Sequence, residues 1–444
     1  MADNVTLNAG SGGATLAADD ISGVKYPRTK IVLGSDGVNS GDISATNPMP
    51  VDFALASSGS GDGFGRVRTS EPVSIFEVTH QYDLAPRLVG LQRQDASTTI
   101  THTTPTAVLA VPAVSGRRIC HQSHKYTIYQ PGKSHLIRIS GQLGTGAILA
   151  GMGYGDDDDG IFLERASTGL QIRFSSSTVA DQLIAQADWN VDKFDGTGTS
   201  GIILDASKVQ QLVVDLQWLA VGRVRVGLSV GGKVCFAHYF NFANIATTAF
   251  MRTASLPVRW YAESLGAAGS MTAICASVSS EGGHDPQGQL FSYALGTSKA
   301  IGTAGVRTPV LSIRPALLFN TLVNRGHIIP LELSAIATSA DNILLEWVAD
   351  GSLTGATFAV PVDARSHAEI DSAATAITGG RVLWADYISS QTRAPIRSTA
   401  AFDAKNRLMT LLANGTDRDL LTLCGTRIAG AASMFAGINW METQ

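Results

Sequence analysis

Two glycine-containing motifs in the sequence match signatures of reactive sites. Residues 227–231 read G-x-S-x-G, the nucleophile elbow, which needs a sharp strand-to-helix turn to expose the serine oxygen. Ser229 falls instead inside a segment with strand periodicity, so we interpret this match as accidental. Residues 196–201 read G-x-G-x-x-G, but a dinucleotide site needs a helix to follow, and residues 202–204 begin no helical pattern. We expect a glycine-rich connecting loop there and no cofactor.

A run of four carboxylates is the main metal candidate. It comprises Asp156, Asp157, Asp158 and Asp159. Hard cations such as Ca²⁺ prefer several oxygen ligands, so calcium is conceivable. The spacing of an EF-hand loop is not met, because Gly155 would stand at its first position and Ala166 at its twelfth. We expect a solvated loop tip, with a calcium site as the alternative.

Cysteine and histidine residues suggest a second kind of metal site. On a strand, His121 and His124 point to opposite faces, while Cys120 and His124 share a face about 13 Å apart. The three side chains therefore cannot chelate one ion. The four cysteines of the chain form no C-x-x-C pair and no zinc-ligand spacing, so we expect four buried or half-buried thiols.

The segment WNVDKFD at residues 189–195 combines aromatic and acidic side chains, as glycosidase sites do. Glycoside hydrolysis needs two carboxyl groups placed about a sugar ring. Asp192 and Asp195 are three residues apart in a loop, and no second carboxylate can be assigned opposite them. We expect these aspartates to bond loop amides and the aromatic rings to anchor the loop. The alternative is a glycan contact made by Trp189, Asp192 and Asp195.

Composition narrows the class of protein. The chain has 444 residues, of which 44% are hydrophobic and 16% charged, so it can build a sizeable core. Its net charge of −4 indicates no basic face for nucleic acid. The N-terminus lacks a signal-peptide pattern, and no stretch of about 18 apolar residues predicts membrane insertion.

The elements that must position these residues are predicted to be short antiparallel strands. Apolar and polar residues alternate in residues 170–174, 212–218 and 223–230, with Arg223 and Arg225 on the outward face of the last. Gly231 and Gly232 then accept the positive φ angles of a type I′ turn, which predicts a hairpin with residues 233–240. One wet face on each sheet is typical of antiparallel β-sandwiches or jelly rolls.

The chain divides into three predicted parts. Residues 1–70 are rich in Gly, Ser, Ala, Asn and Asp, and cannot bury enough apolar surface to offset their ordering entropy. We interpret them as an extended arm. The turn-rich residues 282–288 mark a boundary, so we expect jelly-roll-like β-sandwich domains at residues 71–295 and 305–444. The fold class is therefore all-β.

Several segments resemble a known family. In the arm these are residues 2–15 (ADNVTLNAGSGGAT), Asp19-Asp20 and residues 23–28 (GVKYPR). They resemble the N-terminal arm of structural proteins of tailed bacteriophages, including tail, fibre, collar and head-decoration proteins. Residues 189–202, 204–205, 217–219, 222–225 and 255–257 are similar to a β-domain of phage and large-virus virion proteins. A third recurrent piece is matched by residues 312–315, 324–326, 378–380 and 440–442.

The resemblance implies a non-enzymatic virion protein, assembled in the host bacterial cytoplasm and anchored through its arm. The implied attachment residues are Val5, Leu7, Tyr26, Ile31, Val32 and Leu33. The implied partners are tail, neck or capsid subunits, further copies in a homotrimer, and bacterial surface polysaccharide. The family supplies no catalytic residues. Two other functions stay open: a polysaccharide depolymerase with two carboxylates from different strands in a cleft, and a free carbohydrate-binding module.

Overall fold

The computed structural model describes a chain made almost wholly of strands. The described residues are 5–6, 15–16, 18–27, 72–144, 146–285, 287–338, 341–359, 364–389, 393–396 and 408–443. Apart from one 3₁₀ turn, Gln186–Asp188, every described element is a strand, and all strand pairs are antiparallel. The prediction of an all-β chain with antiparallel sheets is confirmed. No helix in the described ranges is long and apolar enough to cross a membrane.

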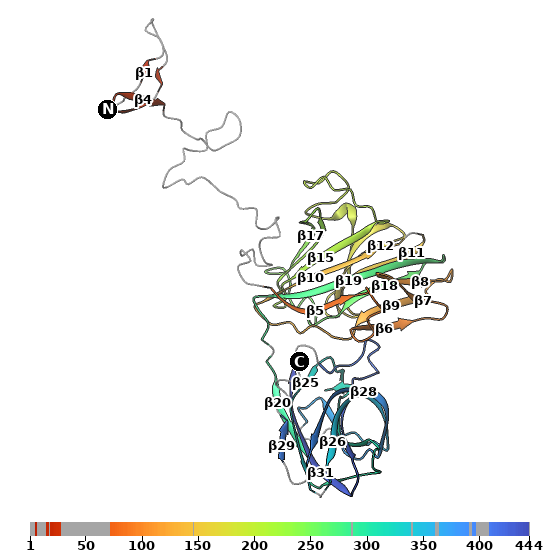
Figure 1. Cartoon of the computed structure of the whole chain (residues 1–444). Helices are drawn as coiled ribbons and strands as arrows, with labels where there is room; N and C mark the ends of the chain where they lie inside the picture. Colours follow the sequence, from red (N-terminus) through yellow and green to blue (C-terminus); the bar gives the residue numbers. More distant parts are fainter. Residues whose placement is uncertain are drawn as a thin grey trace. The chain divides into compact units, whose positions relative to one another are not determined.

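The chain forms two compact units, Met1–Leu55 and Ala56–Gln444. In the first unit, β1 (Val5–Thr6) pairs with β2 (Thr15–Leu16), and β3 (Ala18–Ile21) pairs with β4 (Val24–Pro27) (Figure 1). Ser22 and Gly23 connect β3 to β4 with φ of 53° and 84°, the positive values that a type I′ turn requires. The described part of the first unit therefore consists of two very small antiparallel pairs.

Two large sheets come first in the described part of the second unit. The eight-stranded sheet has the order β17 (Lys233–Asn241), β16 (Arg223–Val230), β15 (Val209–Leu216), β10 (Ser134–Gln142), β19 (Gly269–Glu281), β8 (Thr106–Val111) and β7 (Thr99–Thr103), with β5 (Val73–Thr79) also paired to β19. The seven-stranded sheet has the order β14 (Gln182–Ala185), β13 (Gly169–Ser175), β12 (Gly160–Ala166), β11 (Ile148–Gly155), β18 (Val258–Ser264), β9 (Arg118–Ser123) and β6 (Val89–Gln94).

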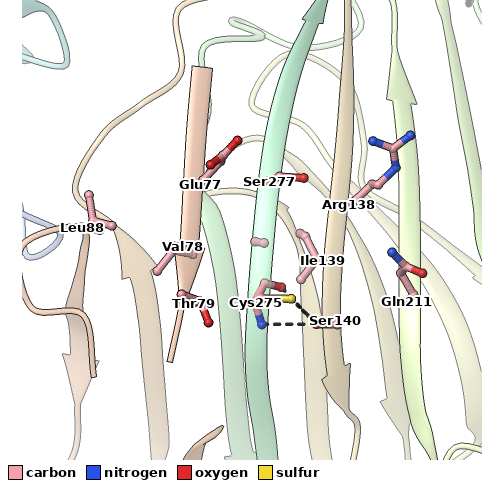
Figure 2. Close-up of a pocket in the computed structure, with 11 residues that line it drawn as sticks. Glu77, Val78, Thr79, Leu88, Arg138, Ile139, Ser140, Gln211, Cys275 and Ser277 are labelled. Carbon is pink, nitrogen blue, oxygen red and sulfur yellow. Dashed lines mark hydrogen bonds between the residues drawn. The ribbon is translucent and has the colours of Figure 1, made fainter. Parts of the chain in front are cut away.

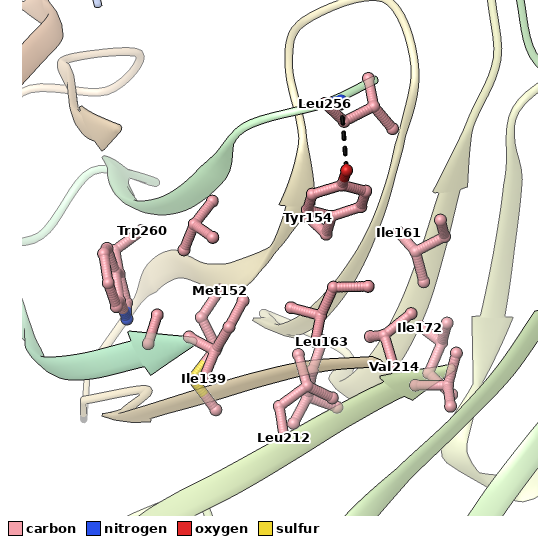
Figure 3. Packing of buried hydrophobic residues seen from close by; sticks show 14 of the residues in the cluster. Ile139, Met152, Tyr154, Ile161, Leu163, Ile172, Leu212, Val214, Leu256 and Trp260 are labelled. Carbon is pink, nitrogen blue, oxygen red and sulfur yellow. Dashed lines mark hydrogen bonds between the residues drawn. The ribbon is translucent and has the colours of Figure 1, made fainter. Parts of the chain in front are cut away.

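One hydrophobic core joins these two sheets into a sandwich (Figure 3). The eight-stranded sheet contributes Ile139 and Leu212, and the seven-stranded sheet contributes Met152 and Trp260, all at most 1% exposed. Alternation along each strand explains the arrangement, because successive side chains point to opposite faces. On β10, Ile139 enters the core while the neighbouring Arg138 stays exposed on the outer face.

The predicted hairpin at residues 223–240 is confirmed. It consists of β16 and β17, joined by Gly231 and Gly232 with φ of 58° and 79°. Ser229 lies on β16, so the G-x-S-x-G match is part of a strand. Arg225 departs from the expected outward exposure: it is fully buried, forms an ion pair with the buried Asp215, and lies over the ring of Phe236 at 4.7 Å. Alternation in the sequence correctly placed Arg225 on the outer face of the sheet, but it did not predict that the side chain would be buried.

Two further sheets surround a second core. One contains β20 (Gln289–Ala294), β31 (Ala432–Thr443), β25 (His327–Ala337) and β29 (Arg393–Ile396), with β21 (Lys299–Ile301) also on β31. The other has the order β27 (Ala368–Asp371), β22 (Thr308–Pro315), β30 (Leu421–Arg427), β26 (Ile343–Thr354) and β28 (Ala376–Ile388). A small pair, β23 (Leu318–Phe319) and β24 (Leu322–Val323), completes the set. Trp347 and Trp440 are buried in this core.

The position of strand β20 differs from the boundary that we expected between the two sandwiches. It lies within residues 71–295, which the sequence assigned to the first sandwich, yet it pairs with β31 of the second set of sheets. Hydrogen-bonding partners far along the chain decide where such a strand belongs, and composition does not reveal them.

Candidate functional site

A groove of about 510 Å³ crosses the outer face of the eight-stranded sheet (Figure 2). Strand register arranges its polar side chains in two rows. We call the first the charged row: Glu77 on β5 stands directly opposite Ser277 on β19, which stands opposite Arg138 on β10. The neutral row lies two residues along each strand, and comprises Thr79, Cys275, Ser140 and Gln211.

The charged row holds one acidic and one basic group on an open surface. Glu77 and Arg138 are both exposed, and Ser277 between them is half-buried. Since adjacent strands lie about 4.8 Å apart, the outer two positions are separated by about 10 Å at the backbone. The row therefore offers an acceptor at one end, a hydroxyl in the middle and a forked donor at the other end.

The neutral row is tied together by its own contacts. The Ser140 hydroxyl lies 2.9 Å from the Cys275 sulfur and accepts the Cys275 amide at 3.2 Å. A register shift between Ser140 and Gly141 accompanies this side-chain-to-backbone bond. All four cysteines are free, but Cys275 is exposed, whereas we expected every thiol to be buried or half-buried.

A second hollow of about 620 Å³ shares Ser140 and Gln211 with the groove. Its other described lining includes Asp205, Lys208 and the turn at Gly231. The Asp205 carboxylate is engaged locally, because it accepts the Ser207 amide at 2.9 Å and the Ser207 hydroxyl at 2.6 Å. The two hollows thus extend one polar surface from β5 to the β16–β17 turn.

The segment at residues 189–195 serves the sandwich itself. Trp189 is 3% exposed, its ring packs edge-to-face on Phe194 at 5.9 Å, and its Nε1 donates to the Ile184 carbonyl at 3.2 Å. The Trp189 ring therefore offers no open face to a sugar.

The two aspartates of this segment bond nearby amides. Asp192 is buried and accepts the amides of Phe194 and Ser200 at 2.9 and 2.8 Å. Burial alone would raise the pKa of Asp192, but these amides outweigh it and hold the pKa below its usual value. Asp195 accepts the Thr197 hydroxyl at 2.6 Å and its amide at 2.9 Å. This arrangement is the anchored loop that we expected, and glycan contact through it finds no support in the geometry.

In the acidic loop, each carboxylate meets a different partner. Asp156 Oδ1 caps the amides of Asp158 and Asp159 at 3.0 Å. The remaining contacts are Asp157 to Arg259 at 2.5 Å, Asp158 to Arg252 at 2.9 Å, and Asp159 to the Ser177 amide at 2.9 Å. Within the described residues, no group of three His, Cys, Asp or Glu side chains is arranged to hold a metal ion. Arginines or amides contact each of these carboxylates, and Asp159 is fully buried, so the solvated loop tip that we expected is only partly correct.

A histidine contact that the structure shows joins His121 to His80, which is distant in the sequence. His121 Nε2 lies 3.1 Å from His80 Nε2, and His80 comes from the end of β5. His124 contacts the Pro86 carbonyl at 3.0 Å and accepts the Ala413 amide at 2.9 Å. His121 and His124 thus have different partners, and β9 ends at Ser123, so the strand alternation that we assumed does not extend to His124.

The predicted attachment residues lie only partly within the described ranges. Val5 is in β1 and Tyr26 is in β4, where its side chain is 51% exposed. Leu7, Ile31, Val32 and Leu33 lie outside the described residues.

The groove residues were missed by motif analysis. Alternation places Arg138 and Gln211 on the outer faces of their strands, and this signal was present in the sequence. It does not show that β5 lies beside β19, so the charged row could not be assembled from the pattern alone.

Comparisons with known proteins give no family. No family model matches this chain, and no curated protein matches it. Similar solved structures include peanut lectin with a nine-residue peptide (10% identity, 48% of this chain, 98% of that chain, TM-score 0.31). They also include the Crh5 transglycosylase (10% identity, 46% and 82%, TM-score 0.31) and the Emp47p carbohydrate recognition domain (11% identity, 47% and 96%, TM-score 0.30). We base no functional argument on likenesses of this degree.

Proposed function

We propose that this chain is a non-enzymatic structural and adhesion protein of a tailed-phage particle. Residues 1–70 act as the arm that holds it in the virion. Two β-sandwich domains, in a homotrimer, project from the particle and present the outer groove to polysaccharide on the bacterial surface. The observation that carries this proposal is an apolar face on the β3–β4 hairpin.

The hairpin face includes three apolar residues, Ile21, Val24 and Tyr26, and the register places Asp19 opposite Tyr26. Ile21 and Val24 are directly opposite each other, and Tyr26 is two residues beyond Val24, so alternation places all three on one face. Their side chains are 59%, 54% and 51% exposed. An isolated two-stranded hairpin is only marginally stable in water. Burying this face against another surface would contribute about 1.5–3 kcal/mol per side chain.

The occupant that we propose for this face is a sheet of a neighbouring virion protein. Short strands can add to an exposed sheet edge through main-chain hydrogen bonds, and apolar side chains then fix the register. This mode of attachment needs little core in the arm itself. It suits a segment whose composition supplies few large apolar residues.

The outer groove suits a polysaccharide because its polar side chains can form hydrogen bonds with sugar hydroxyl groups. Sugar hydroxyls both donate and accept hydrogen bonds, so they can pair with the Glu77 carboxylate, the Arg138 guanidinium and the Gln211 amide. The two polar rows and the adjoining hollow form an extended surface, as a chain-like ligand requires.

The decisive experiment replaces the hairpin face in a phage that encodes this chain. We expect Ile21→Ser, Val24→Ser and Tyr26→Ser together to abolish incorporation into particles, measured by mass spectrometry of purified virions. A matched control, Ile245→Ser, Val114→Ser and Tyr82→Ser, removes the same residue types from exposed positions of the other unit. The control should incorporate normally.

Two results would contradict the proposal. The first is normal incorporation of the hairpin variant at wild-type copy number. The second is a purified protein that shortens capsular polysaccharide chains, which would favour the depolymerase.

A further inference from the structure

A cavity of about 780 Å³ lies within the compact unit Ala56–Gln444. Its described lining comes from both sets of sheets, with Phe76 on β5, Ile329 on β25 and Met441 on β31. It adjoins the outer groove, because Glu77 and Leu88 line both. Its volume falls in the range of about 300–1,000 Å³ that is usual for small-molecule sites.

Much of the cavity wall is apolar. Phe76 and Ile329 are 6% and 3% exposed, and Leu331 and Met441 also line the space. These four side chains lie on β5, β25 and β31, which are paired within sheets, so hydrogen bonding between strands fixes their positions. Such a wall favours an aliphatic or otherwise apolar ligand body.

Lys125 brings a cation to this wall. Its Nζ donates to the Ile75 carbonyl at 2.6 Å, and burial lowers its pKa to about 8. An ammonium group carries three donors, and this is the one hydrogen bond that the described residues give it. The remaining donors suit a ligand oxygen with negative charge, which would also offset the cost of burying the ammonium.

Three other polar atoms of the lining are buried and have no hydrogen-bond partner among the described residues. They are His327 Nε2, Thr410 Oγ1 and Thr443 Oγ1. Their residues are 1%, 4% and 2% exposed. Buried polar groups are normally paired, because desolvation without a partner is costly. Because all three residues line the cavity, these atoms point to a ligand that carries its own polar groups.

The state of His327 indicates which polar group would pair with it. Burial, together with the nearby charge of Lys125, lowers its pKa to about 3, although a hydrogen bond to the Tyr126 backbone opposes this. The ring is therefore neutral near pH 7. Because its other nitrogen serves the backbone, Nε2 presents a lone pair that accepts a hydrogen bond. A hydroxyl group is a suitable donor to it.

We infer that this cavity binds a small amphipathic hydroxy acid, with a carboxylate, a nearby hydroxyl and an apolar chain. The carboxylate accepts from the Lys125 ammonium. The hydroxyl donates to His327 Nε2 and accepts from the Thr443 hydroxyl. The apolar chain packs against Phe76, Ile329 and Met441.

Asp419 also lines the cavity and limits how far a second acidic group could be accommodated. Its carboxylate accepts the Thr410 amide at 2.9 Å, and burial raises its pKa to about 7. A ligand with a single carboxylate, placed at Lys125, avoids repulsion from this group. The site should therefore prefer monocarboxylates to dicarboxylates.

Calorimetric titration of the full chain with three matched probes tests the inference. The probes are 3-hydroxyoctanoate, octanoate and 1-octanol. We expect 3-hydroxyoctanoate to bind at least threefold more tightly than octanoate, and octanoate at least tenfold more tightly than 1-octanol. The ratio of the two acids' affinities measures the hydroxyl contacts. The ratio of octanoate to 1-octanol affinity measures the pairing with Lys125.

Two variants assign these steps to residues. Lys125→Met should weaken binding of both acids at least tenfold and leave 1-octanol unchanged, while Thr443→Val should remove the preference for the hydroxy acid. Lys233→Met, at an exposed lysine of β17, is the matched control and should bind all probes as the wild type does. The inference is overturned if neither acid binds at millimolar concentration, if 1-octanol binds as tightly as octanoate, or if Lys125→Met binds the acids normally.

Discussion

The outer groove and the inner cavity share Glu77 and Leu88, yet they treat polar groups in opposite ways. In the groove, Glu77 and Arg138 stand on strand faces with their charged ends in water. In the cavity, which is lined by loops and strands from two sets of sheets, Lys125 is half-buried and His327 is 1% exposed. Alternation along strands places each groove side chain on an open face, although the pairing of β5 with β19 is needed to bring them together. The cavity depends on contacts between distant parts of the chain.

The largest expected effect is on acid stability, and it comes from deeply buried histidines, of which His327 lines the cavity. Burial lowers the pKa of His121, His135 and His327 to about 3. Between about pH 3 and 6.5 the unfolded chain binds protons at these sites and the folded chain does not, so stability falls as pH falls through this window. Each group contributes up to about 1.4 kcal/mol per pH unit.

Urea unfolding at pH 7, 6 and 5 measures this loss. His121→Phe should reduce the dependence of the unfolding free energy on pH, because one of the three imidazoles whose pKa is lowered to about 3 is gone. An unchanged dependence in this variant would show that His121 is protonated in the folded state as readily as in water.

A smaller effect is expected from Lys125 at alkaline pH. Its folded-state pKa of about 8 lies below the unfolded value, so the unfolded chain holds the proton between about pH 8 and 10.4. Stability from this group therefore rises as pH rises through that window. In the absence of ligand, Lys125→Met should be more stable than the wild type at pH 7 by about 2 kcal/mol, and the difference should shrink toward pH 10. Thermal unfolding of both proteins at these two pH values is the measurement, and a difference that grew with pH would contradict the argument.

The smallest stability effect belongs to the groove. Glu77→Gln and Arg138→Gln together should change the unfolding free energy by less than about 0.5 kcal/mol, because both side chains are exposed and leave the core untouched. The same double variant should lose binding to polysaccharide from the host surface in a co-sedimentation assay. Retained binding would move the glycan contact away from the charged row.

Local patterns in the sequence predicted the strands well where one face is buried. The β16–β17 hairpin follows from alternating residues on either side of Gly231 and Gly232, and its turn requires positive φ at both glycines. The amide-bonding role of Asp192 likewise follows from local loop chemistry. In both cases the partners are close in sequence, so the information is present in a short window.

The charged row and the cavity could not be predicted in this way. Glu77 and Ser277 are 200 positions apart, and Lys125 and Thr443 are further apart still. No periodicity specifies that β5 pairs with β19 or that β25 and β31 meet Lys125. The burial of Arg225 shows the same limit, since its strand pattern predicted an outward direction and tertiary contacts removed it from water.

The position of β31 also affects how the protein must be made. This strand, Ala432–Thr443, pairs with β25 on one side and with β20 and β21 on the other. The second core therefore cannot close until residue 443 has emerged from the ribosome, while β20, β21 and β25 wait with unpaired edges. Such edges invite association between nascent chains. Synthesis that stops before residue 432 should consequently yield an aggregating product, whereas the residues up to 281 can already complete the first core.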